Sequence, residues 1–213
     1  LTPDDIYHLS KLAIMEYLTS GITANADMYL TPDTMIQASE DCGFRTTVIG
    51  AVNDFTQSVK EVENWYEKYH KEDGLTSYEL GFHAEYTTKR EILEDISELS
   101  KKYHAPIYTH NSESASEVAQ CVERTGMTPT VYMEQLGLFE YGGGLYHCVH
   151  MSEEDLDVVK RHQISVITNP ASNLKLASGI APIEEMLKRN IDLAIGTDGP
   201  ASNNCLDMFR EMF

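Results

Sequence analysis

The sequence lacks several features that would place it in a special class of protein. No apolar run among its 213 residues approaches the ~18 residues that a membrane-spanning helix needs. The four cysteines are far apart and form no CxxC pair, which argues against a zinc ribbon or a disulfide framework and suits a reducing, cytoplasmic compartment. No linker rich in Pro, Gly or Ser divides the chain. We therefore expect one domain over residues 1–213.

Basic residues are also scarce. Lys and Arg total 16 against 34 Asp and Glu, which gives a net charge of −18 with the histidines neutral. Such a field repels phosphate backbones and anionic lipid, so nucleic acid and membrane surfaces are not expected partners, whereas a small nucleoside remains possible as a ligand. Apolar residues make up 42% of the chain and charged residues 23%, which is typical of a globular protein.

Strand-like and helix-like patterns alternate about seven times, at the spacing of βα units. This alternation predicts a parallel α/β architecture. The predicted strands cover residues 22–28, 45–52, 78–84, 106–109, 145–149, 164–168 and 191–195. The predicted helices cover residues 2–20, 32–42, 59–70, 89–102, 114–125, 132–136, 153–162 and 182–189, and a last helix starts within 205–213.

The position of the polar residues favours a barrel over an open sheet. A Rossmann-type sheet would normally carry GxGxxG after its first strand, and the chain has no such motif. Polar residues instead follow the carboxyl ends of several strands, as in the active sites of (β/α)₈ barrels. They are Asp27, His83, His110, His147, Asn169 and Asp198. Because seven βα units are visible and a closed barrel needs eight, we predict an incomplete TIM-type (β/α)₈ barrel.

Each of these residues taken alone has a structural alternative. A lone histidine after a strand, such as His110, is more often a hydrogen-bonding residue than a ligand, although Glu113 three residues later favours function. His147 has a rival in His150, and Asp198 could be a turn residue or a helix N-cap. Imidazole and carboxylate groups at several strand ends of one face are, however, the ligands that a hydrolytic Zn²⁺ or Fe²⁺ uses.

Five segments together carry a family resemblance: HAEYTT, PIYTHNSES, YHCVHMSEEDL, NPASNLKLASGIAP and GTDGPASNN. In this combination the chain resembles the amidohydrolase superfamily over essentially its whole length. It is most similar to the S-adenosylhomocysteine/5′-methylthioadenosine deaminase branch, with triazine chlorohydrolases and guanine deaminases as near relatives. The resemblance implies a metal-dependent barrel that hydrolytically deaminates a purine-like heterocycle and releases ammonia.

The resemblance also implies a role for each residue of the site. His110 and Asp198 would bind one divalent metal, zinc or alternatively iron, and Asp198 would take a proton from the attacking water. Glu113 would protonate a ring nitrogen of the substrate, and His147 would polarise or orient the water. His83 would contact the substrate heterocycle together with Glu113.

The chain departs from the family pattern in two ways. No H-x-H motif, which supplies the family's other two metal ligands, occurs among the eight histidines, and the family's small flanking β-sandwich is also missing. We therefore expect a barrel fragment of a longer enzyme that binds metal weakly or not at all and is inactive by itself. Its unpaired strand edges would be covered by another copy of the chain in a homo-oligomer, by helices that collapse inward or by a strand supplied in trans, so we expect the fragment to be oligomeric or only moderately stable. Residues 48–62 contain no arginine, although family members acting on S-adenosylhomocysteine use arginine there, so methylthioadenosine, adenosine or another aminated heterocycle stays open.

Two other functions remain as alternatives. One is hydrolysis of a different C–N bond or of a C–Cl bond, as in the guanine- and triazine-type relatives, which substrate profiling would distinguish. The other is a non-catalytic barrel fragment used for binding or assembly.

Overall fold

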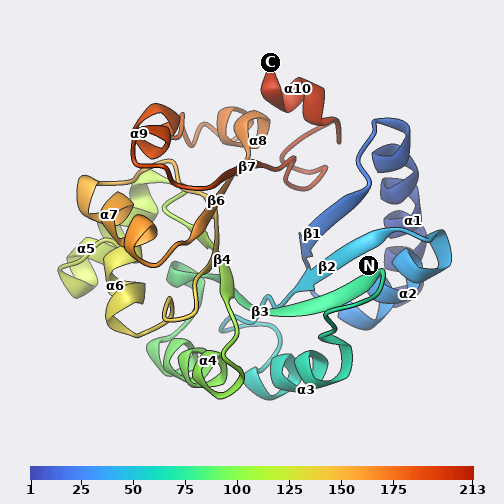
Figure 1. The fold of residues 1–213 in the computed structure, drawn as a ribbon, viewed down its shortest axis with the longest axis horizontal. Helices are drawn as coiled ribbons and strands as arrows, with labels where there is room; N and C mark the ends of the chain where they lie inside the picture. Colours follow the sequence, from blue (N-terminus) through green and yellow to red (C-terminus); the bar gives the residue numbers. More distant parts are fainter.

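The computed structural model describes residues 1–213 as a curled sheet of seven parallel strands with helices outside it (Figure 1). The strands follow one another in the sheet in chain order. They are β1 (Ala24–Met28), β2 (Arg45–Ile49), β3 (Thr76–Ala84), β4 (Ile107–Asn111), β5 (Gly143–His147), β6 (Ser165–Thr168) and β7 (Leu193–Ile195). The helices are α1 (Pro3–Thr19), α2 (Pro32–Cys42), α3 (Val59–Tyr69), the 3₁₀ turn η1 (Glu85–Thr87), α4 (Arg90–Tyr103), α5 (Ala115–Thr125), α6 (Pro129–Gln135), α7 (Glu153–Arg161), α8 (Pro170–Lys175), α9 (Ile183–Lys188) and α10 (Met208–Met212).

The predicted α/β fold is confirmed, and its element boundaries follow local signals. α2 begins at Pro32 and ends before Gly43, whose φ of 64° provides a left-handed cap. The strand predicted over 145–149 is instead Gly143–His147, because His147 and Cys148 adopt φ values of 68° and 50° that end the ladder. The strand predicted over 45–52 stops at Ile49, after which only one isolated bridge continues it.

Two helices also differ from the prediction. The short helix α8 follows β6 directly and was not predicted from the sequence. The last helix begins only at Met208, because the side chain of Asp207 accepts a hydrogen bond from the Phe209 amide and caps it there. None of the helices combines the length and the apolar character that crossing a lipid bilayer requires.

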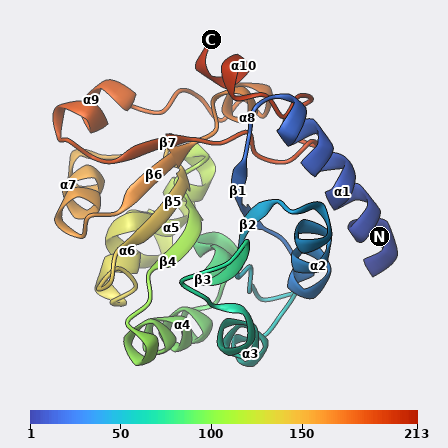
Figure 2. The same ribbon diagram turned by 45° about the vertical axis from the view of Figure 1, so that its right-hand side comes forward.

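The sheet does not close into a full barrel. β1 pairs only with β2 and β7 only with β6, so each leaves one edge without a strand partner. The carboxyl end of α1 nevertheless lies beside the segment that precedes α10, near this opening (Figure 2). The Ser20 hydroxyl donates to the Leu206 carbonyl at 3.0 Å, and the Leu206 amide donates to the Glu16 carboxylate at 2.9 Å. The prediction of an incomplete barrel with seven βα units is confirmed.

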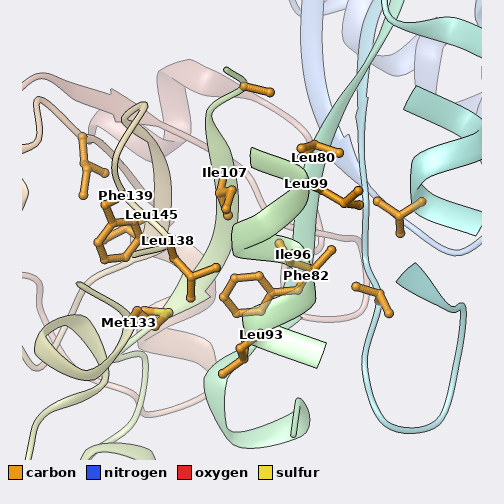
Figure 3. Packing of buried hydrophobic residues seen from close by; sticks show 14 of the residues in the cluster. Leu80, Phe82, Leu93, Ile96, Leu99, Ile107, Met133, Leu138, Phe139 and Leu145 are labelled. Carbon is orange, nitrogen blue, oxygen red and sulfur yellow. The ribbon is translucent and has the colours of Figure 1, made fainter. Parts of the chain in front are cut away.

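A hydrophobic core fills the space between the strands and the outer helices. Leu80 and Phe82 of β3 and Ile107 of β4 are fully buried and pack in one cluster with Leu93 and Ile96 of α4 (Figure 3). Each such side chain contributes about 1.5–3 kcal/mol through burial. This packing holds β3 and β4 in place, and their carboxyl ends carry His83 and His110.

Asp27 near the end of β1 is expected to make stability depend on pH. Burial raises the pKa of its carboxyl from 3.8 to about 6, so the folded chain retains a proton that the unfolded chain has lost. The free energy of unfolding should therefore fall as pH rises from about 4 to about 6 and stay low above that range. Asp27→Asn should remove this fall and stabilise the chain at pH 7.5 by about 1–3 kcal/mol.

Urea unfolding of the wild-type chain and of Asp27→Asn at pH 4.5 and 7.5 measures this difference. Asp73→Asn, a change at an exposed loop position, is the matched control. Equal stability of Asp27→Asn and wild type at pH 7.5 would contradict the prediction.

Candidate active site

Three strand ends bring three histidines together. His83, His110 and His147 lie at the carboxyl ends of β3, β4 and β5. The ring centroids of His83 and His110 are 4.9 Å apart, and those of His110 and His147 are 5.5 Å apart with nearly parallel planes. Because all the strands are parallel, their carboxyl ends meet at one face, where barrel enzymes build their sites.

His110 is held in one tautomer by a backbone carbonyl. Its Nδ1 lies 2.6 Å from the carbonyl oxygen of His83, which can only accept, so Nδ1 carries the proton. Burial, together with smaller contributions from the neighbouring His147 and His83, lowers the pKa of His110 to about 4, so the ring is neutral at pH 7. Nε2 therefore retains its lone pair, as a metal ligand requires.

His83 is oriented in a similar way by η1. The Thr87 hydroxyl donates to the Ala84 carbonyl at 3.1 Å and lies 2.9 Å from Nδ1 of His83, so it accepts the Nδ1 proton. Nε2 of His83 is then a hydrogen-bond acceptor. Burial lowers the pKa of His83, which favours this neutral form.

His147 links β5 to Glu113. Its Nδ1 lies 2.7 Å from the side-chain oxygen of Asn173, which assigns the proton to Nδ1 and turns Nε2 toward Glu113. Nε2 is 3.7 Å from the Glu113 carboxylate, longer than a direct hydrogen bond. The Ser178 hydroxyl donates to the other carboxylate oxygen at 3.3 Å. The rival His150 instead contacts the Ser178 carbonyl through Nε2 at 2.8 Å.

Asp198 is kept ionised by three donors. Burial alone would raise its pKa, but hydrogen bonds from the hydroxyls of Ser172 and Ser202 and from the amide of Gly199 lower it below the usual value. The two hydroxyls donate at 2.6 and 2.7 Å, and the amide at 2.6 Å. The positive φ of 57° at Asp198 turns the chain sharply after β7.

Glu117 was not predicted to belong to the site, yet it holds the backbone of the segment that carries Glu113. Its buried carboxylate accepts hydrogen bonds from the amides of Ser112 and Glu113, both at 2.9 Å, and from Ser114 at 3.4 Å. Ser114 and Glu117 form the capping box that starts α5. The S-x-x-E spacing was visible in the sequence, but it predicts only a helix start.

We expect Glu117→Gln to displace Glu113 without unfolding the chain. The glutamine keeps one acceptor oxygen. Its NH₂ group, however, is a donor, and it would face a backbone amide that in the wild-type chain donates to the carboxylate. Faster hydrogen exchange at the Ser112 and Glu113 amides, by roughly tenfold, is the expected result, measured by NMR. Glu123→Gln on the exposed side of α5 is the control. Unchanged exchange at both amides would show that Glu117 does not hold the segment.

The structure thus places His83, His110, His147 and Glu113 side by side, each next to the one before it. Asp198 is near enough for its charge to favour protonation of His110, although burial dominates the pKa of that histidine. No group of three or more metal-ligating side chains converges anywhere in the chain. His110 and Asp198, the two residues predicted to bind a metal, are therefore not part of a cluster of three or more possible metal ligands.

Comparison with known proteins places this arrangement in a family. The profile described as the amidohydrolase family matches residues 1–213. The chain belongs to the amidohydrolase family. The 5-methylthioadenosine/S-adenosylhomocysteine deaminase of Caldanaerobacter subterraneus is 40% identical over 221 residues, covering 100% of the chain and 51% of that protein. The 5′-deoxyadenosine deaminase of Methanococcus maripaludis is 36% identical over 215 residues, covering 97% of the chain and 51% of that protein.

Solved amidohydrolase-like structures show the same fold. An adenosine deaminase from Xanthomonas campestris with bound zinc superimposes with a TM-score of 0.93 at 32% identity, covering 99% of the chain and 50% of that structure. The zinc complex of the atrazine chlorohydrolase from Arthrobacter aurescens superimposes with a TM-score of 0.89 at 24% identity, over 97% of the chain and 51% of that structure. The chain spans about half the length of the relatives and structures that it matches.

Proposed function

We propose that this chain forms the barrel part of a metal-dependent aminohydrolase that releases ammonia from an aminated, purine-like heterocycle of the adenosine type. The observation that carries the proposal is the geometry at the ends of β4 and β5. A neutral His110 with a free Nε2 stacks on His147, whose Nε2 faces the Glu113 carboxyl. The deaminase names of relatives at 36–40% identity support the substrate class.

The donor set fits one divalent metal, zinc or alternatively iron. His110 offers a neutral imidazole nitrogen and Asp198 an ionised carboxylate, the two ligand types that hydrolytic zinc sites use. When bound, such a metal lowers the pKa of water to about 7 and so supplies a nucleophile at neutral pH. The zinc in the Xanthomonas campestris structure supports this choice.

The side chains of the site would divide the proton transfers among them. Asp198 is ionised and can accept a proton from the attacking water. Glu113 can hold a proton on the carboxylate oxygen nearest His147 and donate it to a ring nitrogen, which makes the amino-bearing carbon more electrophilic. His147 can orient the water through Nε2, and His83 can accept a hydrogen bond from the heterocycle through its own Nε2. Water adds to that carbon, and ammonia leaves.

An ammonia-release assay tests the proposal. The 213-residue chain and the whole protein that contains it would be incubated with zinc or iron and with 5′-methylthioadenosine, 5′-deoxyadenosine, S-adenosylhomocysteine, adenosine, guanine and a chlorotriazine. We expect the whole protein to release ammonia from the adenosine-type compounds. Chloride release from the triazine or ammonia from guanine alone would favour the alternative hydrolases, and no reaction of the metal-loaded protein with any compound would refute the proposal.

We also propose that the chain forms a homo-oligomer. β1 and β7 each leave one edge unpaired, and exposed strand edges favour pairing with another chain. Sedimentation of the 213-residue chain measures its mass in solution, and a monomer at every concentration would refute this proposal.

A further inference from the structure

A buried ion pair joins η1 to α5. Glu85, the first residue of η1, is 2% exposed, and its carboxylate accepts a hydrogen bond from the Arg124 guanidinium at 2.6 Å. Arg124 lies in the last turn of α5, and its side chain is 51% exposed. Glu85 belongs to the HAEYTT segment, yet neither that motif nor the proposed division of proton transfers gives it a role.

Arg124 is the only residue that forms an ion pair with this carboxylate. The second carboxylate oxygen of Glu85, Oε2, is buried and receives no hydrogen bond from the protein. Cys121, one turn earlier on α5, lies close by: burial raises the pKa of its thiol to about 11, and the charge of Glu85 contributes to this rise. A thiol brings no compensating charge. Loss of the guanidinium would therefore leave a negative charge in the interior without a partner, which is strongly destabilising.

The gain from such a pair lies in geometry more than in stability. Two charges taken out of water lose about as much hydration energy as their attraction returns, and apolar residues of similar volume often serve a fold as well. A guanidinium and a carboxylate, however, attract each other in a narrow range of arrangements. The pair therefore matters for where it holds η1.

The segment that the pair holds orients two histidines of the site. The Thr87 hydroxyl donates to the Ala84 carbonyl and lies 2.9 Å from Nδ1 of His83. The carbonyl oxygen of His83 lies 2.6 Å from Nδ1 of His110. Glu85 lies two residues after His83 and two before Thr87, so a shift of its backbone would disturb both contacts.

η1 also lies along the helix that follows Glu113. Burial raises the pKa of the Tyr86 phenol, and the charges of Glu117 and Glu113, at the start of α5, contribute to the rise. Tyr86 is therefore near the first turn of α5, whereas Glu85 pairs with its last turn. The ion pair thus ties the loop after β3 to the helix that starts beside Glu113.

We propose that Glu85 is a positioning residue of the site. Through Arg124 it holds η1 against α5, which keeps His83 in its Nδ1-protonated tautomer and places the carbonyl that fixes His110. The consequence for catalysis rests on the proposed function, whereas the consequence for the histidine tautomers does not.

Nitrogen NMR of the whole protein with isotope-labelled histidine measures the tautomers directly. In the wild type we expect His83 and His147 each to show a single, Nδ1-protonated tautomer. Arg124→Met removes the guanidinium and keeps most of the volume of the stem, and His83 should then show nitrogen shifts averaged between two tautomers. His147 should not change, because Asn173 holds it from a different loop.

The double variant Glu85→Gln/Arg124→Met separates positioning from stability. It contains no buried charge, so its urea midpoint should return close to the wild-type value, whereas His83 should still show two tautomers because no ion pair holds η1. Arg124→Lys keeps a positive charge and should keep most of the single tautomer. Arg161→Met, which removes an exposed arginine paired with Glu134 on another helix, is the matched control and should change neither quantity at His83 nor turnover.

Turnover of an adenosine-type substrate should follow the tautomer and not the stability. We expect kcat/KM to fall about tenfold in Arg124→Met and in the double variant, and less than about threefold in Arg124→Lys. A single His83 tautomer in the double variant would overturn the proposal, because η1 would then keep its place without the pair. Equal changes at His83 and His147 would overturn it as well, since the disturbance would be general. If the wild-type protein deaminates no compound, the proposed function fails, and the histidine spectra still test the role of Glu85.

Discussion

Replacing Glu113 by glutamine is expected to reduce ammonia release from an adenosine-type substrate by about 10²–10⁴-fold. A glutamine cannot hold a proton and pass it to the ring nitrogen, whereas its shape preserves the contact with the Ser178 hydroxyl. The metal content of the whole protein should not change, because Glu113 faces His147 and not the free Nε2 of His110. Steady-state kinetics and metal analysis of the same preparation measure both quantities.

Two results would contradict this assignment in different ways. Loss of metal in Glu113→Gln would show that the carboxylate is a ligand. Near-normal turnover would show that another group protonates the substrate. Glu123→Gln, which changes an exposed carboxylate on the helix that follows Glu113, should leave both quantities unchanged and controls for the change in net charge.

The sequence predicted the seven strands because each one is a short apolar run bounded by turn residues or helix signals. It placed the end of β5 two residues too late, because the run of apolar residues continues through Cys148 and Val149 after the backbone has turned. A left-handed φ at a histidine and a cysteine leaves no signal in apolar periodicity. After that turn His147 lies near Glu113 while His150 contacts the Ser178 carbonyl, a difference that apolar periodicity alone does not show.

The candidate site residues could be proposed from their motifs, whereas the residues that hold them in place could not. His110 and Asp198 come from two such motifs, but the tautomer of His110 follows from the carbonyl of His83 on a different strand. The Ser172 hydroxyl reaches Asp198 from α8, 26 residues earlier in the chain, whereas Ser202 lies only four residues after Asp198. Hydrogen bonds between separate loops depend on tertiary packing, and a single sequence does not encode their partners in any local pattern.

Zinc binding by the 213-residue chain is expected to be weak, with a dissociation constant of about 10 μM or weaker at pH 7. A complete structural zinc site with four ligands contributes about 10 kcal/mol or more, and two protein ligands supply only part of that. His110 and Asp198 are well prepared as donors, since one is neutral with a fixed tautomer and the other is ionised. The correct protonation of two candidate ligands does not replace the other ligands of a complete zinc site. No third metal-ligating side chain of this chain lies with them.

Competition with a coloured zinc chelator measures this affinity, and the variants test which residues provide it. His110→Ala and Asp198→Asn should each weaken the remaining affinity by about tenfold or more, because each removes one of two protein ligands. His8→Ala, at an exposed histidine on α1, should leave it unchanged. If the 213-residue chain retained one zinc per molecule after dialysis against EDTA, the two-ligand interpretation would be wrong, and the donors would have to come from side chains that move together when the metal binds. If the affinity were weak but unaffected by His110→Ala, zinc would be bound elsewhere on this acidic surface.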